Sequence, residues 1–407
     1  MFRRDERSNP RWPVSPTAVI WTALWVVGGC GDDGPAPAQP DPVTAPAAPA
    51  PAPPPTLPAK LSIDLTDAEL TAADAMRRTL SAGKAPVPTD KDVRVWLAVI
   101  DGHADPGAVA RSLVTIGHRR HGNAGAFTEV FSPHRADLAL VATRLTERGD
   151  DHLARLAIRQ LLAPLLAGDA PAPLATAVDV RLGRLAGDTA RDPSVRGLAA
   201  GTIGDVERMR TACSALLADA DPYVAWHAMA SCNRPPLANR LIGLTRHALA
   251  PVRARAVQAL ARATREAGDS GDTEGDKRAA KFAERYILPM LDAPEPHVRG
   301  GAIEALGHIA SVAAVASLAA DAVAKHVTDG AATAHAHVWK KADGSVWRQG
   351  NVPLLLDQGS VSAQAAMAFN RMSGGAITTG LHPRDRPGDA EREAAAEQAR
   401  QWLAARP

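Results

Sequence analysis

Residues 192–196 spell DPSVR, and this short motif returns three more times along the chain of 407 residues. The later copies read DPYVA from Asp221, APVR from Ala250 and EPHVR from Glu295. From valine to valine the steps are 29, 28 and 46 residues, and the last step is long because an acidic, glycine-rich loop is expected at residues 268–276. A unit of near thirty residues that resembles itself predicts a repeat array.

The residues that follow each repeat valine have the period of a helix. Apolar or small side chains stand four, seven and eight residues after it, and these offsets share one helix face. The sets after Val195, Val224, Val252, Val298 and Val361 are Ala199, Thr202 and Ile203; Ala228, Ser231 and Cys232; Ala256, Ala259 and Leu260; Ala302, Ala305 and Leu306; and Ala365, Ala368 and Phe369. Shorter runs begin at Val93 (Leu97, Ile100) and Leu153 (Ala157, Leu161). Each stripe is predicted to be buried, and the recurrent alanine lets neighbouring helices approach closely.

The turn before each helix also has a physical reason. An Asp or Glu before the proline can cap the unpaired N–H groups of the first turn, and proline there loses no hydrogen bond. Arg196, Arg253 and Arg299 recur in the first turn, where the helix dipole disfavours a cation. We therefore expect the carboxylates of neighbouring turns to pair with them, as a ladder of charge pairs.

The pattern D-P-x-V-R-x-x-A-x-x-A-L-G resembles HEAT repeats, particularly the short bacterial type. The match is strong over residues 192–309 and degenerate over 64–187. The resemblance implies an all-α fold, an α-α superhelix or solenoid of the HEAT/armadillo type. Each repeat would be two antiparallel helices, the first exemplified by residues 206–217, and the stack would form a right-handed arc whose concave surface binds macromolecules.

The resemblance and the composition together predict five segments. The first 29 residues would be a signal peptide, residues 30–58 a Pro/Ala-rich linker and residues 59–190 degenerate helical repeats. Residues 191–372 would be HEAT-like repeats, and residues 373–407 a loop and a polar capping helix. Terminal repeats need such a cap because their outer face meets water.

The N-terminus has the features of an export signal. Basic residues precede an apolar stretch at 17–27, which is too short for a transmembrane helix of roughly 20 residues. The following Val27-Gly28-Gly29-Cys30 resembles the lipobox of bacterial lipoproteins, although the family usually has Leu where Val27 stands. The resemblance implies lipidation of Cys30, anchoring in the outer membrane and a periplasmic body. The alternative is an ordinary cleavable signal in which the cysteine is fortuitous.

The composition limits the function. Apolar residues make up 46% of the chain and aromatic residues only 4%, so the core must consist of small aliphatic side chains that suit close helix packing. The 46 basic and 44 acidic residues give a net charge of +2, which argues against a nucleic-acid partner. No motif for a cofactor is found, so none is expected.

Three tryptophans are candidate partner-binding residues. Residues 338–348 (VWKKADGSVWR) carry an Asp-Gly turn between short alternating runs, which predicts a small β-hairpin insertion. Either one of its tryptophans, Trp339 or Trp347, packs onto the solenoid while the other stacks on its cross-strand cation, or Trp339, Trp347 and Arg348 form a finger that contacts a partner. Trp226 stands two residues after a repeat valine, outside the buried stripe, and is either an inter-repeat contact or a surface anchor.

The remaining candidates are cysteines and histidines. Cys213 and Cys232 either form a disulfide within one repeat or remain two buried thiols. The histidine pairs at 118 and 121 and at 335 and 337 lack companion ligands at metal spacing, so no metal site is expected. The acidic stretch 268–276 does not have the order of a calcium loop.

The sequence therefore favours a non-catalytic scaffold that is tethered to the cell envelope and binds another envelope protein. Neither a G-x-S-x-G elbow nor an H-E-x-x-H helix is found. One alternative is an enzyme built on the same solenoid, since some HEAT-type proteins act as bilin lyases or DNA glycosylases. Another is a glycan-binding envelope protein, against which the low aromatic content argues.

Overall fold

The computed structural model describes residues 57–58, 89–102, 105–107, 109–114, 131–168, 170–268, 273–310, 313–333, 359–376, 380–381 and 385–405. All of them belong to one compact unit that spans residues 53–407. They are mostly helical, and their one β pairing is an isolated antiparallel bridge between Ala332 and Ser360. The prediction of an all-α solenoid of the HEAT/armadillo type is confirmed.

The α-helices of the described residues vary in length. Their bounds are α2 (Asp90–Gly102), α5 (Arg135–Glu147), α6 (Asp151–Ala157), α7 (Ala163–Ala167), α8 (Ala172–Gly187), α9 (Pro193–Thr202), α10 (Val206–Leu217), α11 (Pro222–Ala228), α12 (Ala238–Leu244), α13 (Ala250–Gly268), α14 (Thr273–Phe282), α15 (Pro296–His308), α16 (Ala313–Ala324), α17 (Val361–Met372) and α18 (Asp389–Ala404). Short 3-10 and π segments join or extend them, among them η3 (Pro235–Leu237) and η4 (Ala283–Ile287).

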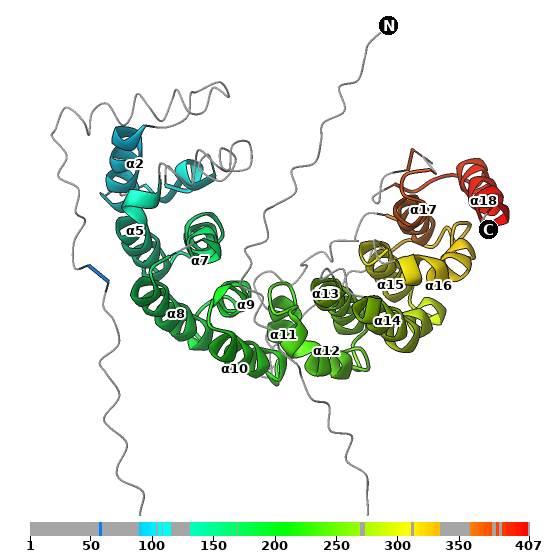
Figure 1. Ribbon diagram of the computed structural model, residues 1–407, viewed down its shortest axis with the longest axis horizontal. Helices are drawn as coiled ribbons and strands as arrows, with labels where there is room; N and C mark the ends of the chain where they lie inside the picture. Colours follow the sequence, from blue (N-terminus) through cyan, green and yellow to red (C-terminus); the bar gives the residue numbers. More distant parts are fainter. Residues whose placement is uncertain are drawn as a thin grey trace, which may run out of the picture. The chain divides into compact units, whose positions relative to one another are not determined.

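The helices from α8 onward pack in two rows, which Figure 1 shows side by side. The helices that begin at the repeat valines, α9, α11, α13, α15 and α17, each contact the next, and we call them the valine row. The helices α8, α10, α12, α14 and α16 precede them and form the companion row. Each repeat is therefore a pair of helices that buries its apolar face against its neighbours, as a solenoid requires.

The predicted stripes are buried. The alanine four residues after each repeat valine is 0% exposed in all five sets: Ala199, Ala228, Ala256, Ala302 and Ala365. The large side chains at offset eight, such as Leu260 and Phe369, are also buried. Thr202 and Ser231 depart from the pattern because they are only partly buried.

The capping prediction holds at two turns and is wrong at the third. The carboxylate of Asp192 accepts a hydrogen bond from the Ser194 N–H (2.8 Å), and Asp221 accepts one from the Tyr223 N–H (2.9 Å). Glu295 forms no side-chain cap on α15. Its carboxylate binds the guanidinium of Arg253 from the preceding repeat instead.

Glycine allows the valine row to pack closely. A Cβ atom on Gly197 of α9 would lie 2.8 Å from the Ala228 Cα of α11, and one on Gly307 of α15 would lie 3.1 Å from the Ala368 Cα of α17. Side chains cannot fit where backbones approach this closely. The close helix contacts therefore depend on small side chains, and this agrees with the low aromatic content.

The long step between the third and fourth valines has a different origin from the one expected. The acidic stretch was expected to be a loop, but α13 continues to Gly268 and α14 begins at Thr273, so only residues 269–272 fall between the two helices. The additional length therefore extends helices.

The C-terminal helix α18 closes the array. It buries Ala395, Ala396 and Ala399 on one face, and the Trp402 ring meets Phe369 of α17 edge to face at 5.4 Å. The other residues of α18 are largely exposed and charged, as expected of a capping helix.

Several predictions lie outside the described residues, namely the signal peptide, the lipobox with Cys30, most of the linker and the hairpin at 338–348. In the part of the chain that the structure describes, no helix combines the length and apolarity needed to cross a bilayer.

Candidate functional site

The expected ladder of charge pairs joins successive repeats. The Arg253 guanidinium of α13 lies 2.6 Å from Glu295 in the turn before α15. Arg299 of α15 lies 2.8 Å from Asp329, and Arg196 of α9 lies 3.9 Å from Asp219. Each arginine thus binds a carboxylate of the next repeat, which offsets its unfavourable place at a helix N-terminus.

The arginines also bind backbone carbonyls. Arg253 donates to the His247 and Ala248 oxygens at 3.0 and 2.9 Å, and Arg299 donates in the same way to the Ala293 and Pro294 oxygens at 2.8 and 3.0 Å. One guanidinium therefore fixes the turn before its own helix and the turn before the next, so the ladder sets the angle between repeats.

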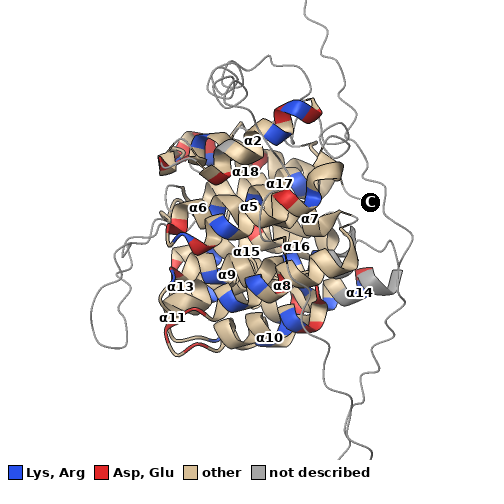
Figure 2. Ribbon diagram, turned by 90° about the vertical axis from the view of Figure 1, so that its left-hand side faces the viewer, with Lys and Arg blue, Asp and Glu red and all other residues tan. Residues whose placement is uncertain are grey.

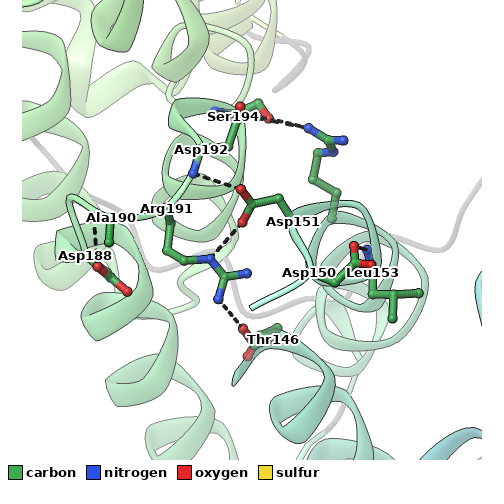
Figure 3. Close-up of polar contacts among 10 residues, drawn as sticks. Thr146, Asp150, Asp151, Leu153, Asp188, Ala190, Arg191, Asp192 and Ser194 are labelled. Atoms are coloured by element: carbon green, nitrogen blue, oxygen red, sulfur yellow. Dashed lines mark hydrogen bonds and ion pairs between the residues drawn. The ribbon is translucent and has the colours of Figure 1, made fainter. Parts of the chain in front are cut away.

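An earlier rung has the opposite polarity (Figure 3). Here the arginine belongs to the later turn: Arg191 Nε donates to Asp151 of α6 (2.7 Å), and its Nη1 donates to the Thr146 carbonyl (2.8 Å). The second oxygen of Asp151 accepts from the Asp192 N–H (3.1 Å). Figure 2 shows basic and acidic residues interspersed over this face of the stack, and this pairing uses both signs.

The rung between α11 and α13 is missing. Ala225 occupies the arginine position of α11, and residues 222–265 contain no Asp or Glu that could serve as the partner. An aromatic contact joins these helices instead, because the Arg255 Cζ lies 5.3 Å from the centroid of the Trp226 indole. A cation over an indole face is favourable, more so when both groups are shielded from water.

Trp226 is therefore an inter-repeat contact, and the alternative of a surface anchor is wrong. Its side chain is 4% exposed. The ring packs parallel to Tyr223 at 6.4 Å and meets His227 edge to face at 4.9 Å. Burial against its own helix and against α13 leaves no face of the indole for a partner protein.

The same cluster brings together titratable groups that the sequence did not connect. Burial, reinforced by Asp192, raises the pKa of Tyr223 above its usual range. Burial outweighs the opposing effect of Asp192 and, with the help of Arg255, lowers the pKa of His227 to about 4. Burial and Arg262 lower the pKa of Arg255 to about 10.

At neutral pH the cluster holds a protonated tyrosine, a neutral histidine and a charged arginine. General acid–base catalysis works best with a group whose pKa is close to the working pH. The pKa values of Tyr223 and His227 lie far from neutrality on opposite sides. The arrangement is therefore suited to holding two repeats together, and it is poorly suited to proton transfer.

The two cysteines of this repeat form a disulfide in the structure. Cys213 lies on α10 and Cys232 follows α11, with their Cα atoms 5.6 Å apart. Both side chains are fully buried. The bond joins the two helices of one repeat, at the core position where the other repeats carry an aliphatic or aromatic side chain.

The other candidate residues, Cys30, Trp339, Trp347 and Arg348, lie outside the described residues. The two ends of the segment that contains the tryptophans are described. The Thr333 N–H donates to the Gly359 carbonyl and the Val361 N–H donates to the Ala331 carbonyl, both at 3.0 Å. Residues 333 and 359 therefore meet at one point beside α17.

Sequence reasoning missed a groove between consecutive repeats. A cavity of about 320 Å³ opens between α7, the connection from α9 to α10, and the start of η3. Its lining residues are Ala163, Leu166, Ala167, Gly201, Thr202, Ile203, Gly204, Val206, Met209, Arg234, Pro235 and Pro236. The one sequence signal was Val206, an aliphatic residue at the first position of a helix whose first turn is otherwise polar.

Within the described ranges, no three His, Cys, Asp or Glu side chains are grouped so that they could hold a metal ion. The histidines at 118, 121, 335 and 337 are not among the residues described.

No protein-family model matches the chain, and a search of curated proteins finds no match. Solved structures do resemble it. A designed armadillo repeat protein is 17% identical, with 53% of this chain and 98% of that chain covered and a TM-score of 0.31. An engineered protein is 17% identical, with 84% and 97% covered and a TM-score of 0.35. Kap121p is 14% identical with a TM-score of 0.43, and the match covers 82% of this chain but 36% of Kap121p.

Proposed function

We propose that the protein is a lipid-anchored, non-catalytic scaffold that binds another protein of the cell envelope. The observation that carries this proposal is the two-row stack, in which each helix pair buries its ridges only against its neighbours. Such a stack presents a long surface on a frame held by Arg–carboxylate rungs, and arrays of this kind bind macromolecules along that surface.

Export and anchoring are supported by the sequence and by the disulfide. The lipobox-like Val27-Gly28-Gly29-Cys30 precedes a spacer of Pro and Ala that suits a tethered body. A buried disulfide between Cys213 and Cys232 is typical of proteins that fold outside the reducing cytoplasm. The predicted location is the outer membrane, with the solenoid facing the periplasm.

Contact with the partner is assigned to residues 338–348, through Trp339, Trp347 and Arg348. The bonds between the described residues on either side, 331–333 and 359–361, support this assignment, since the chain leaves and returns at one point beside α17. Trp and Arg are the residues that most often dominate binding energy at interfaces.

A non-catalytic role is supported by the buried cluster of Tyr223, His227 and Arg255. It is the most strongly perturbed group of titratable side chains among the described residues, and neither its tyrosine nor its histidine changes protonation near neutral pH. Its contacts are those of a junction between repeats.

The test is crosslinking in cells with the full-length, exported chain. A photo-crosslinking residue in place of Trp347 should capture one recurrent envelope protein, and the Arg348→Ala substitution should reduce the yield. The same crosslinker in place of Arg184, an exposed residue of α8, is the matched control. No recurrent partner at position 347, or equal capture at position 184, would refute the scaffold.

The anchor is tested separately. Mass spectrometry of the mature N-terminus should find acyl chains on Cys30, and Cys30→Ala should release the protein from membranes into the soluble fraction. An unmodified thiol on a membrane-free protein would refute the anchor and leave the scaffold in place.

A further inference from the structure

The helices before the missing rung are braced against one another. A Cβ atom on Gly201 of α9 would lie 2.5 Å from the Ser231 carbonyl oxygen, just after α11, and Arg196 of α9 pairs with Asp219 in the turn before α11. The rung drawn in Figure 3 joins the turn before α9 to α6 in the same way. Backbone contact and charged bonds at the turns leave these helices little freedom to tilt, so the described residues from 90 to 228 form a first arm.

The helices after the missing rung are braced more closely still. In addition to the rung between their turns, the Gln258 Nε2 of α13 donates to the Glu304 carboxylate of α15 at 2.6 Å. A Cβ atom on Gly301 of α15 would lie 3.3 Å from the Ala254 carbonyl oxygen of α13. Helix α12 packs on α13, so α12 to α18 form a second arm.

The junction between the two arms is held by contacts of another kind. Helices α11 and α13 contact each other less than any other neighbouring pair of the valine row. Residues 222–265 contain no Asp or Glu, so no ion pair joins α11 to residues 250–265 of α13. Apolar packing and the stacking of Arg255 on Trp226 connect them. Apolar burial is not directional, so it tolerates a change of angle that charge-assisted hydrogen bonds resist.

The backbone between the arms has a short pivot. The disulfide fixes Cys232 to α10, and the prolines at 235 and 236 each have a restricted φ. Backbone rotation is therefore concentrated at residues 233 and 234, which lie outside any helix. Hinges between rigid bodies are typically a few such residues at the ends of elements.

We propose that the solenoid bends at the junction between α11 and α13, with the two arms moving as rigid bodies about residues 233 and 234. Bending changes the angle between the arms, and with it the surface that the stack presents. The inference goes beyond the proposed function and does not depend on it, because it rests only on how the repeats are joined.

The test is a set of distance distributions in the full-length exported protein, measured by double electron–electron resonance. Spin labels on ketone-bearing amino acids at exposed positions leave the disulfide intact. Labels in place of Arg184 and Leu318 span the junction. Labels at positions 114 and 184 lie within the first arm, and labels at positions 284 and 398 lie within the second. The spanning distribution should be at least about twofold wider than both others.

Two variants change the junction in opposite directions. Arg255→Met removes the stacked cation and should widen the spanning distribution alone. Ala225→Arg with Leu249→Glu rebuilds the rung, because these positions match Arg253 and Glu295 relative to their repeat valines, and it should narrow that distribution. Ala225→Met with Leu249→Gln is the matched control, which has similar side-chain length without charge and should not narrow it.

A spanning distribution no wider than those within the arms would overturn the proposal, and so would equal widths for all three pairs in every variant. If the rebuilt rung does not fold, an unchanged spanning width in Arg255→Met still refutes the hinge. Crosslinking at position 347 tests the scaffold separately, so a rigid junction with a captured partner would overturn this inference alone.

Discussion

The close approach of α9 and α11 gives a direct test of the packing. In the substitution Gly197→Ala, the new Cβ would lie 2.8 Å from the Ala228 Cα, 3.1 Å from its nitrogen and 3.2 Å from the His227 carbonyl oxygen. All three atoms belong to the backbone, so no side chain can turn aside. The two helices must separate to admit one methyl group.

Two effects of opposite sign determine the size of the change. Alanine stabilises a helix relative to glycine by about 0.5–1 kcal/mol. Overpacking of a well-packed contact costs about 1–3 kcal/mol. Gly183→Ala in α8 isolates the first effect, because nothing lies within 4 Å of its new Cβ. The difference between the two variants cancels the helix term and should be about 1–3 kcal/mol.

The assay is urea unfolding followed by circular dichroism, with both variants and the parent chain measured side by side. Gly183→Ala should raise the midpoint slightly, and Gly197→Ala should lower it. Gly197→Ala should also increase hydrogen exchange in α9 and α11 first, since these helices lose their contact. If Gly197→Ala is as stable as Gly183→Ala, the helices are not in contact at this glycine and the packing argument is wrong.

Three further predictions concern bonds between and within repeats. Arg299→Met should lower the free energy of unfolding by about 1–3 kcal/mol, since it removes charged hydrogen bonds to Asp329 and to two carbonyls. Arg181→Met removes an exposed pair with Glu147 and should lower it by only about 0–1 kcal/mol. Urea unfolding measures both changes. A reducing agent should destabilise the parent by about 3 kcal/mol and lower its thermal midpoint, as expected for a loop closed by cysteines 19 residues apart. It should leave the midpoint of Cys213→Ser unchanged. The pKa of His227 is about 4 in the folded protein, against an ordinary value of 6.5, so the unfolded state binds the proton first as the pH falls. Up to about 3 kcal/mol of stability is therefore lost between pH 6.5 and pH 4. His227→Gln should flatten that pH dependence in unfolding experiments.

The local features of the fold could be predicted because each is set by a few consecutive residues. The stripe after Val298, the proline turns and the capping helix that ends near Trp402 all follow from helix period and helix-end chemistry. Even the pairing of Arg299 with a carboxylate of another turn could be expected, because a cation at a helix N-terminus needs an opposite charge.

The features that could not be predicted depend on residues distant in sequence. The identity of each partner carboxylate, such as Asp329 for Arg299 over 30 residues, is decided by how repeats stack. The same is true of the groove, whose lining comes from three separate segments. The capping role expected of Glu295 was wrong because the stronger charged partner, Arg253, lies 42 residues away.

One property of the segment 222–265 explains the missing rung. A carboxylate at the turn before α13 could have paired with an arginine at position 225 of α11, as Glu295 before α15 pairs with Arg253 of α13. Its absence means that Ala225 can replace the arginine of α11 without leaving an acidic group unpaired. The junction is then held by Trp226 and Arg255 across the repeats and by the disulfide within one of them.

The same absence also sets the charge on the surface of this repeat. Arginines that are not consumed by carboxylates of their own repeat keep their charge available, and Arg240 and Arg246 form no ion pair with a described residue. A repeat that gave up internal charge pairing for an aromatic junction therefore keeps arginines on its surface, where their charge meets water.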